Sequence, residues 1–216
     1  MTKRGLTCVV RALAFNVATF LSLTAYAQNV GDEVVRQLRD LPTSLPAMGR
    51  SDGTIDPVEQ RRGVLYQQLL QLGDEGSRAL AEALREPDVQ LRKNVALALA
   101  ILAGDWNVST QKQKLNIRAY LPALVAALRD DDGSVRGRVA QAIGTIGPEA
   151  APAVSDLVTL LTATDEGSRN SACIALYGIG PVARGALPAL RRALSDPSAD
   201  VRRFAQRAIE KIEGQR

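Results

Sequence analysis

The segment LPALVAALRDDDGSVRGRVAQAIGTIGP, residues 121–148, has the pattern of two short amphipathic helices joined by a turn and closed by a Gly-Pro pair. Its apolar positions, its arginine and its Gly-Pro pair return in residues 154–181. A second step of the same length reaches 187–212, with the same apolar positions and another arginine. Helical units that recur at such a period, about 33 residues, cannot bury their apolar faces alone and must stack. The sequence therefore predicts an all-α solenoid.

Residues 77–103 match the same unit, because Leu80 and Leu84 take the places of Leu124 and Leu128, but the step to the next unit is longer than the other steps. The excess predicts an insertion between Gly104 and about Leu115, and this insertion holds Trp106, the only tryptophan. We expect Trp106 either to fold over the joint between two units or to contact a partner.

A helix is also predicted upstream of these units. Asp56 and Pro57 are typical of a helix start, and Gly73 is typical of its end. The predicted helix therefore spans the residues between these two signals.

The N-terminus has the features of a secretion signal. Residues 1–27 contain three basic residues, a mostly apolar run at 12–23 and a small-x-small site, Ala25-Tyr26-Ala27. The run is shorter than the roughly 20 apolar residues that a spanning helix requires. We expect export to the periplasm or the medium, cleavage after Ala27, and no stable membrane span after cleavage. The predicted organisation is a signal peptide at 1–27, a helix and loop at 28–55, and a repeat domain at 56–216.

The charge of the chain lies mostly in this leader. The whole sequence has 27 basic and 23 acidic residues, and the leader contributes three of the basic ones and none of the acidic ones. The remaining 24 basic and 23 acidic residues give a net charge of +1, which predicts no general attraction to nucleic acid. Only Cys173 remains after cleavage, so no intramolecular disulfide can form.

Three short motifs resemble the parts of a HEAT repeat: LPAL at 121–124, DGSVR at 132–136 and AIGTIG at 142–147. They are similar in particular to the HEAT-like repeats of phycobilisome lyases, and the resemblance covers roughly residues 56–213. It implies a right-handed stack in which first helices form the convex side and second helices the concave side, where partners usually bind. Ser155 departs from the pattern because it replaces a proline of the first helix.

The composition argues against most catalytic chemistry. The chain has no histidine, the commonest general base and metal ligand. A single cysteine after cleavage cannot form a thiolate zinc site. We therefore expect no catalytic residue, no metal and no cofactor, and a protein that is not an enzyme. The alternative is a small-ligand carrier or lyase-like enzyme built on the same repeats, for which fold analogy is the support.

An arginine recurs once in each unit. Position 136 shares a helix face with Val139 and Ile143, so the arginine points into the seam between units, where a charge has to be paired. An aspartate stands four residues before three of these arginines, at a spacing that allows pairing. We interpret the series as a structural ladder, and the alternative is a row of guanidiniums for carboxylates or phosphates. The members are Arg62, Arg92, Arg136, Arg169 and Arg202 with Asp88, Asp132 and Asp165.

The second helices also predict a binding surface. If their apolar stripe faces inward, a neighbouring row faces the concave side, and in the central units this row is apolar or small rather than charged. We expect a protein or peptide partner here, with Tyr177 as an aromatic anchor beside two glycines, and a monomeric chain. The competing view is that curvature buries this row between adjacent helices. The candidate residues are Leu97, Ile101, Gln141, Ile174 and Tyr177, with Trp106 as a second contact site.

Overall fold

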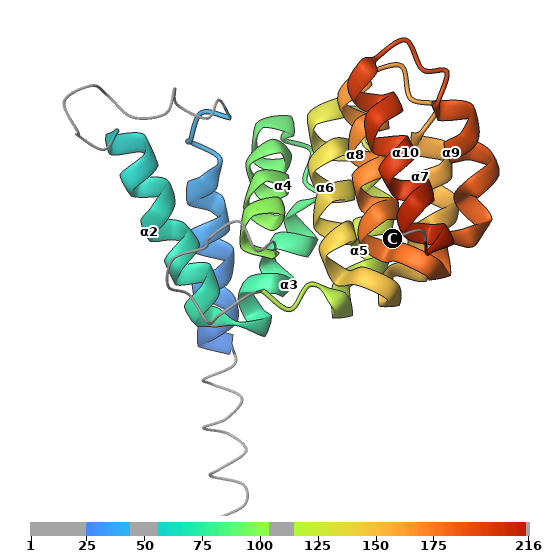
Figure 1. The fold of residues 1–216 in the computed structure, drawn as a ribbon. Coiled ribbons are helices and arrows are strands. Elements are labelled where there is room, and N and C mark those ends of the chain that lie inside the picture. The colour runs from blue at the N-terminus through green and yellow to red at the C-terminus, as the bar shows by residue number, and fades with distance from the viewer. Residues whose placement is uncertain (1–24, 44–55, 104–114, 215–216) are drawn as a thin grey trace, which may run out of the picture.

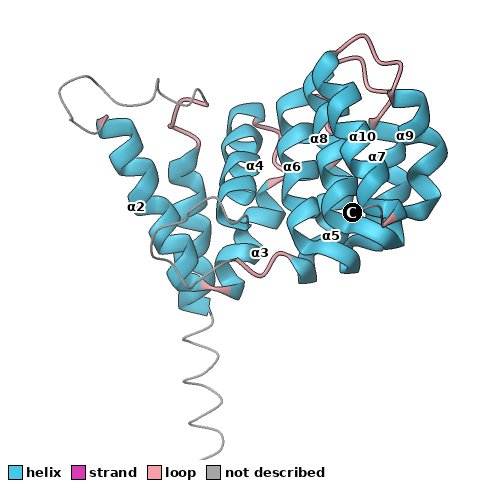
Figure 2. Ribbon diagram, viewed as in Figure 1, coloured by secondary structure: helices cyan, strands magenta, loops and turns pink. Residues whose placement is uncertain are grey.

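The computed structural model describes residues 25–43, 56–103 and 115–214 of the 216-residue chain. Within these ranges every regular element is a helix, and successive helices stack side by side into an elongated solenoid (Figures 1 and 2). The prediction of an all-α solenoid is confirmed. The predicted insertion, with Trp106, lies outside the described residues, as do most of the predicted signal peptide and most of the loop predicted before residue 56.

The N-terminal part consists of helix 25–38 followed by α2 (Pro57–Leu72), α3 (Asp74–Ala83) and α4 (Val89–Ala103). The predicted start of α2 is correct, because the Asp56 carboxylate accepts a hydrogen bond from the backbone N–H of Val58 at 2.8 Å. Its end at Gly73 is also correct. This glycine has φ +56°, a backbone conformation that residues with a Cβ rarely adopt.

The C-terminal part repeats one arrangement three times. A short first helix and a turn precede a long second helix, and a 3₁₀ segment leads into the next unit. Gly147 and Gly180 end two second helices with φ +75° and +72°, which explains why the Gly-Pro pair recurs. The elements are η1 (Arg118–Tyr120), α5 (Leu121–Ala127), α6 (Gly133–Ile146), η2 (Gly147–Ala153), α7 (Val154–Leu160), α8 (Glu166–Ile179), η3 (Gly180–Ala186), α9 (Leu187–Ala193) and α10 (Ala199–Glu213).

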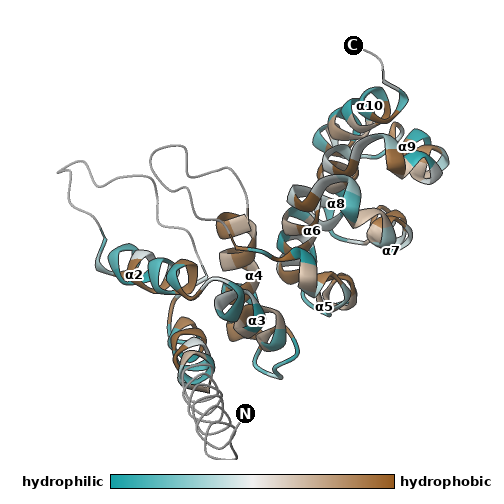
Figure 3. Cartoon of the chain, turned by 90° about the horizontal axis from the view of Figure 1, so that it is seen from below, coloured by the Kyte–Doolittle hydropathy of each residue, from teal (hydrophilic) through white to brown (hydrophobic). Residues whose placement is uncertain are grey.

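The helices form two layers. Seen down the helix axes, α3, α5, α7 and α9 lie on one side and α4, α6, α8 and α10 on the other, and the row of second helices bends around the inner side (Figure 3). Each second helix packs mainly against the second helix of the next unit, with α8 between α6 and α10. The surface of α4, α6, α8 and α10 that faces away from the first helices is called the inner face below.

The core runs the length of the stack, between the layers. Ile143 is fully buried, as the sequence predicted, and so are its counterparts Leu99 and Leu176. The two inner helices of the central units also approach closely: a Cβ added to Gly178 would lie 2.3 Å from the carbonyl oxygen of Gly144. Glycine is therefore required where α6 and α8 cross.

One apolar stretch among the described residues has the length and composition of a membrane-spanning segment, Glu166–Ala193. It comprises α8, η3 and α9, with Gly180 and Pro181 between the two helices. Half of its most apolar window is buried inside the structure. This burial is typical of core helices, and the apolar composition is explained by packing in the stack.

Candidate binding surface

The seam arginines follow one geometry. In Arg92, Arg136 and Arg169, Nη1 donates to two backbone carbonyls of the turn just before the arginine's own helix, at 2.7–3.0 Å. The Nε and Nη2 side of the same guanidinium faces the following unit. Arg169 uses this side to donate to both carboxylate oxygens of Asp196, at 2.8 and 3.0 Å, a bidentate pair. Both sides of each guanidinium thus form hydrogen bonds within the protein, which is consistent with a structural role for these three arginines.

The pairing partners differ from the sequence prediction. We predicted that Asp88, Asp132 and Asp165 pair with the arginine four residues later in the same unit. Instead Arg92 pairs with Asp130, and Arg136 with Asp165, so each bond crosses to the next unit. The prediction was wrong because the predicted aspartates accept hydrogen bonds from N-terminal backbone N–H groups of their own helices, while the arginine side chain extends across the seam.

A difference at one repeat position explains why Arg136 pairs differently from Arg92 and Arg169. Asp130 and Asp196 stand at equivalent positions two repeats apart, and the equivalent position between them is Ala163. Without a carboxylate there, Arg136 bonds Asp165, which also caps α8 through the N–H of Ser168 at 2.7 Å. A groove of about 420 Å³ lies beside this alanine, lined in part by Arg136 and the turn of the preceding unit. The sequence analysis missed Asp130 and Asp196, although their spacing of two repeat lengths was visible.

The two ends of the predicted ladder differ from its centre. Arg62 is 2% exposed and bonds Glu59 of its own helix and the carbonyl of Pro42. It therefore holds helix α2 to the end of helix 25–38 and is not a rung between repeats. Arg202 donates to the carbonyls of Asp196 and Pro197, as the other arginines do in their turns. Among the described residues, no carboxylate pairs with Arg202.

These pairs shift the ionisation of the carboxylates. The hydrogen bond from Arg169 lowers the pKa of Asp196 below its ordinary value. For Asp165, burial by itself would raise the pKa, but hydrogen bonds from Ser168 and Arg136 lower it overall. Both carboxylates are therefore held in the charged form, in which they bind their arginines most strongly.

The predicted row on the inner face is only partly accessible. Gln141 and Tyr177 are exposed, and Ile101 and Ile174 are half-buried. Leu97 is 4% exposed, so the prediction that it contacts a partner is wrong. It belongs to residues 94–99 of α4, six consecutive buried residues that together point in every direction around the helix. The α4 helix is therefore enclosed at this level, and the accessible inner face begins at α6.

Aromatic rings and cations gather at the C-terminal end of the inner face. The guanidinium of Arg207 lies 5.8 Å from the ring centres of both Tyr177 and Phe204, and the Lys211 ammonium lies 5.9 Å from the ring centre of Tyr177. These are cation–π distances. We call Tyr177, Phe204, Arg207 and Lys211 the inner cluster. Phe204, which is not among the predicted binding residues, is half-buried and contributes one ring to this surface.

The glycines near Tyr177 have another role than predicted. We expected Gly178 and Gly144 to leave room around the aromatic ring. The space beside them is instead filled by the crossing of α6 and α8, since a Cβ on Gly144 would lie 2.9 Å from the Cα of Ala175. Tyr177 is nevertheless 40% exposed. Its ring lies toward α10, near Arg207 and Lys211.

Other chemistry is sparse in the described part of the chain. No three acidic or cysteine side chains gather there as a metal site. Cys173 is fully buried, and burial raises the pKa of its thiol to about 12. Its thiol is therefore protonated at neutral pH and unreactive.

The fold and the accessible inner face define the class of the molecule as an all-α solenoid of stacked helical hairpins. Residues 121–210 match the family model for HEAT repeats. No curated protein matches the sequence.

Solved structures have the same architecture. An engineered protein aligns with a TM-score of 0.58 and 25% identity over 87% of this chain and 76% of its own. A designed armadillo repeat protein in complex with the peptide (KR)4 aligns with a TM-score of 0.57 and 21% identity, over 84% and 81%. The complex of CpcE and CpcF of phycocyanin lyase from Nostoc sp. PCC7120 aligns with a TM-score of 0.55 and 19% identity, over 69% and 89%. At these identities the similarity concerns the fold.

Proposed function

We propose that this protein is an exported repeat scaffold that binds a protein or peptide partner on its inner face. The observation that supports this most is Tyr177, a large aromatic side chain that is 40% exposed on the inner face and flanked by cations. Tyrosine and arginine are over-represented among the residues that dominate binding energy at interfaces. The designed armadillo protein, whose structure contains a peptide, provides an architectural precedent for such a use of stacked helices.

The inner face also offers an extended peptide a row of equivalent positions. The second helices of consecutive units lie in register, so equivalent side chains form a row across α6, α8 and α10 (Figure 3). A repeat protein presents such a row as one extended surface, in which each unit contributes a few contacts. We place the partner along this row, and the chain binds it as a monomer.

Export is the second component of the proposal. It rests on the sequence features of residues 1–27 and places the scaffold in the periplasm or outside the cell. The intact mass of protein made in a secreting host tests it, and the expected product begins at Gln28. A product that retains residues 1–27 would contradict export with cleavage.

A lyase-like activity is the alternative, favoured by the fold similarity to the phycocyanin lyase complex. Chemistry at the inner face would need a nucleophile or a titratable pair. The inner cluster offers a phenol, a guanidinium and an ammonium, and the chain has no histidine to serve as a general base beside them. We therefore favour binding over catalysis.

The proposal is tested by capture from the native extract with the purified chain. Tyr177→Ala should weaken capture of the same partner by more than about 1 kcal/mol with little effect on stability. Val182→Ala is the matched control, since this residue is 52% exposed but lies in η3, outside the inner face. Equal capture by wild type and Tyr177→Ala, or equal losses in both variants, would contradict binding at the inner face.

A further inference from the structure

The inner cluster differs from the rest of the inner face in its chemistry. Position 207 corresponds to Gln141 and Ile174 in the two preceding units, and position 211 corresponds to Thr145 and Gly178. The equivalent positions are thus neutral in α6 and α8 and cationic in α10. The repeat pattern does not require cations there, because equivalent residues in the other units support the same helix packing.

The cations of the cluster are held in place by rings and not by carboxylates. Arg207 lies against Tyr177 and Phe204 at the same distance, 5.8 Å to each ring centre. A contact with a ring does not require the N–H groups of the guanidinium, which can still donate to an acceptor. Within residues 25–43, 56–103 and 115–214, neither Arg207 nor Lys211 forms an ion pair.

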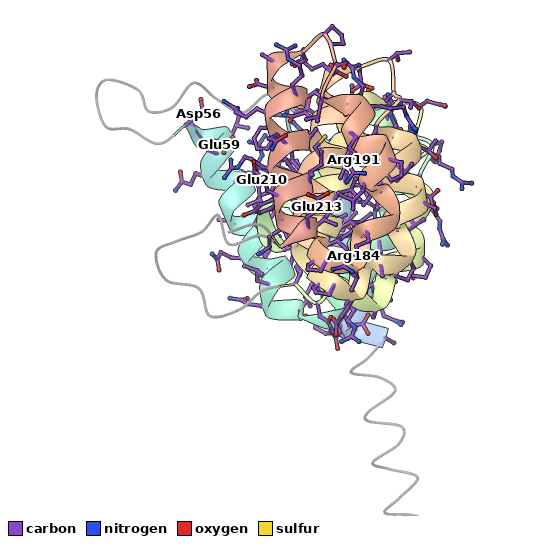
Figure 4. All side chains as sticks on the ribbon, turned by 45° about the vertical axis from the view of Figure 1, so that its right-hand side comes forward. Asp56, Glu59, Arg184, Arg191, Glu210 and Glu213 are labelled. Carbon is purple, nitrogen blue, oxygen red and sulfur yellow. The ribbon has the colours of Figure 1, made fainter. Side chains whose placement is uncertain are left out.

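The acidic groups nearby are engaged elsewhere. Asp200 pairs with Arg203 at 2.8 Å, and Glu210 accepts a hydrogen bond from Gln206 at 2.7 Å. On the other side of α10, Glu213 pairs with Arg191 of α9 at 2.7 Å, and both are labelled in Figure 4. None of these three acids forms an ion pair with Arg207 or Lys211.

We infer that the inner cluster binds an acidic peptide segment, with carboxylates on Arg207 and Lys211 and an apolar side chain against Tyr177. The inference rests on the proposed function and assigns the chemical class of the partner. Charge complementarity is the argument: two preoriented cations attract carboxylates, and the neutral row on α6 and α8 continues the surface for uncharged residues. The peptide in the designed armadillo complex is basic, whereas the inner cluster of this chain would select the opposite charge.

A nucleic acid fits the same surface less well. A continuous phosphate backbone needs several cations in a row, and the inner cluster has two. Two carboxylates of a peptide match the two cations in number. The test therefore includes a nucleic acid as an outcome.

The experiment measures fluorescence polarisation of a short labelled glutamate-rich peptide titrated with the full chain. A lysine-rich peptide and a single-stranded oligothymidine are titrated in parallel. We expect the acidic peptide to bind most tightly, with an affinity that falls as salt is added, because the contacts are ionic and exposed.

Two double variants test whether the peptide binds at the inner cluster. Arg207→Gln/Lys211→Gln should weaken binding by about tenfold or more, since two charge-assisted contacts are lost. Arg184→Gln/Arg192→Gln removes the same charge from exposed positions on η3 and α9, outside the inner cluster (Figure 4 labels Arg184), and should change the affinity by less than about twofold. Circular dichroism melting verifies that both variants are folded.

Three results would overturn the inference: tighter binding of oligothymidine or of the lysine-rich peptide, no binding of the acidic peptide, or equal losses in the two double variants. If the acidic peptide fails to bind while Tyr177→Ala still weakens capture of the native partner, the scaffold function stands and only the partner class is wrong. If both fail, the inner face is not the binding surface.

Discussion

The two parts of the solenoid are stabilised in different ways. From α5 to α10 the same contacts recur: a glycine with positive φ, a capping aspartate or serine, and an arginine that bonds its own turn and then the next unit. The α4 helix still follows this pattern at Arg92, but helix 25–38 is held to α2 and α4 by individual contacts. Asn94 donates to the carbonyls of Leu38 and Leu41 at 2.8 and 2.7 Å, and Arg62 bonds the carbonyl of Pro42. The regular units are stabilised by contacts that recur from unit to unit, whereas the irregular end is stabilised by contacts that occur once.

This difference predicts how far the effect of a substitution extends along the stack. In the regular part each unit is stabilised by its neighbours, so a defect in one should be felt in the next. In the irregular part a lost contact should release mainly helix 25–38, which is held by its own buried apolar residues and by a few buried polar side chains from α2 and α4. The family match agrees with this division, since it covers residues 121–210 and not the N-terminal units.

The largest effect is expected at Ile143, which is fully buried between the layers. Ile143→Ala removes buried methylene and methyl groups and should cost about 2–5 kcal/mol of unfolding free energy. Chemical denaturation measures it, and hydrogen exchange should show lost protection in both α6 and α8. Val64→Ala, at a position 54% exposed on α2, is the control and should change stability little. An unchanged stability in Ile143→Ala would contradict the assigned register.

The next effect concerns the seam pair of Arg169 and Asp196, whose side chains are 14% and 8% exposed. Asp196→Asn leaves the guanidinium without its carboxylate and should cost about 2–4 kcal/mol at neutral pH. The pKa of Asp196 is lowered in the folded state. Its stabilisation is therefore complete above the unfolded pKa of about 3.9 and is lost as the pH falls through the folded pKa.

The pH dependence provides a check on this pair. The wild type should lose stability between about pH 5 and pH 2, and Asp196→Asn should lose less over the same interval, because one titrating group is gone. Denaturation at several pH values measures both curves. Parallel curves would show that the pair contributes no pH-dependent stability.

The smallest effect tests the irregular end. Asn94→Ala removes one of the two donors to each of the carbonyls of Leu38 and Leu41, which keep the N–H of Leu41 and the Nε2 of Gln90, and should cost about 1 kcal/mol. We expect hydrogen exchange to increase in helix 25–38 while α8 and α10 keep their protection. A loss of protection that reaches α10 would mean that the two parts are one cooperative unit.

The same difference explains what the sequence could predict. The repeat period was enough for the fold and for the burial of Ile143, since both follow from the pattern within one unit. The partners of the seam arginines depend on how the next unit is oriented, and a helical wheel of one unit contains no such information. Leu97 was misplaced for a similar reason, because its burial results from how α4 is enclosed and not from its own unit.

The inner cluster was predicted in part. The period placed Tyr177 on the inner row, and the structure brings it together with Arg207 and Lys211. Phe204 was missed because an apolar residue beside a core stripe is assigned to the core by default. Phe204 and Arg207 are three residues apart on α10, a spacing that brings side chains together on one helix face, and Arg207 also lies near the ring of Tyr177 on α8.

Site-specific photocrosslinking tests the inner face most directly. A photoreactive residue is placed at Gln141 or Thr145, which are exposed on α6, and at Ala126 or Thr159, which are exposed on the first helices α5 and α7. After irradiation with the captured partner, covalent adducts are identified by mass spectrometry. We predict adducts from positions 141 and 145 and none from 126 and 159. Adducts from the first helices, without any from the inner positions, would contradict binding at the inner face.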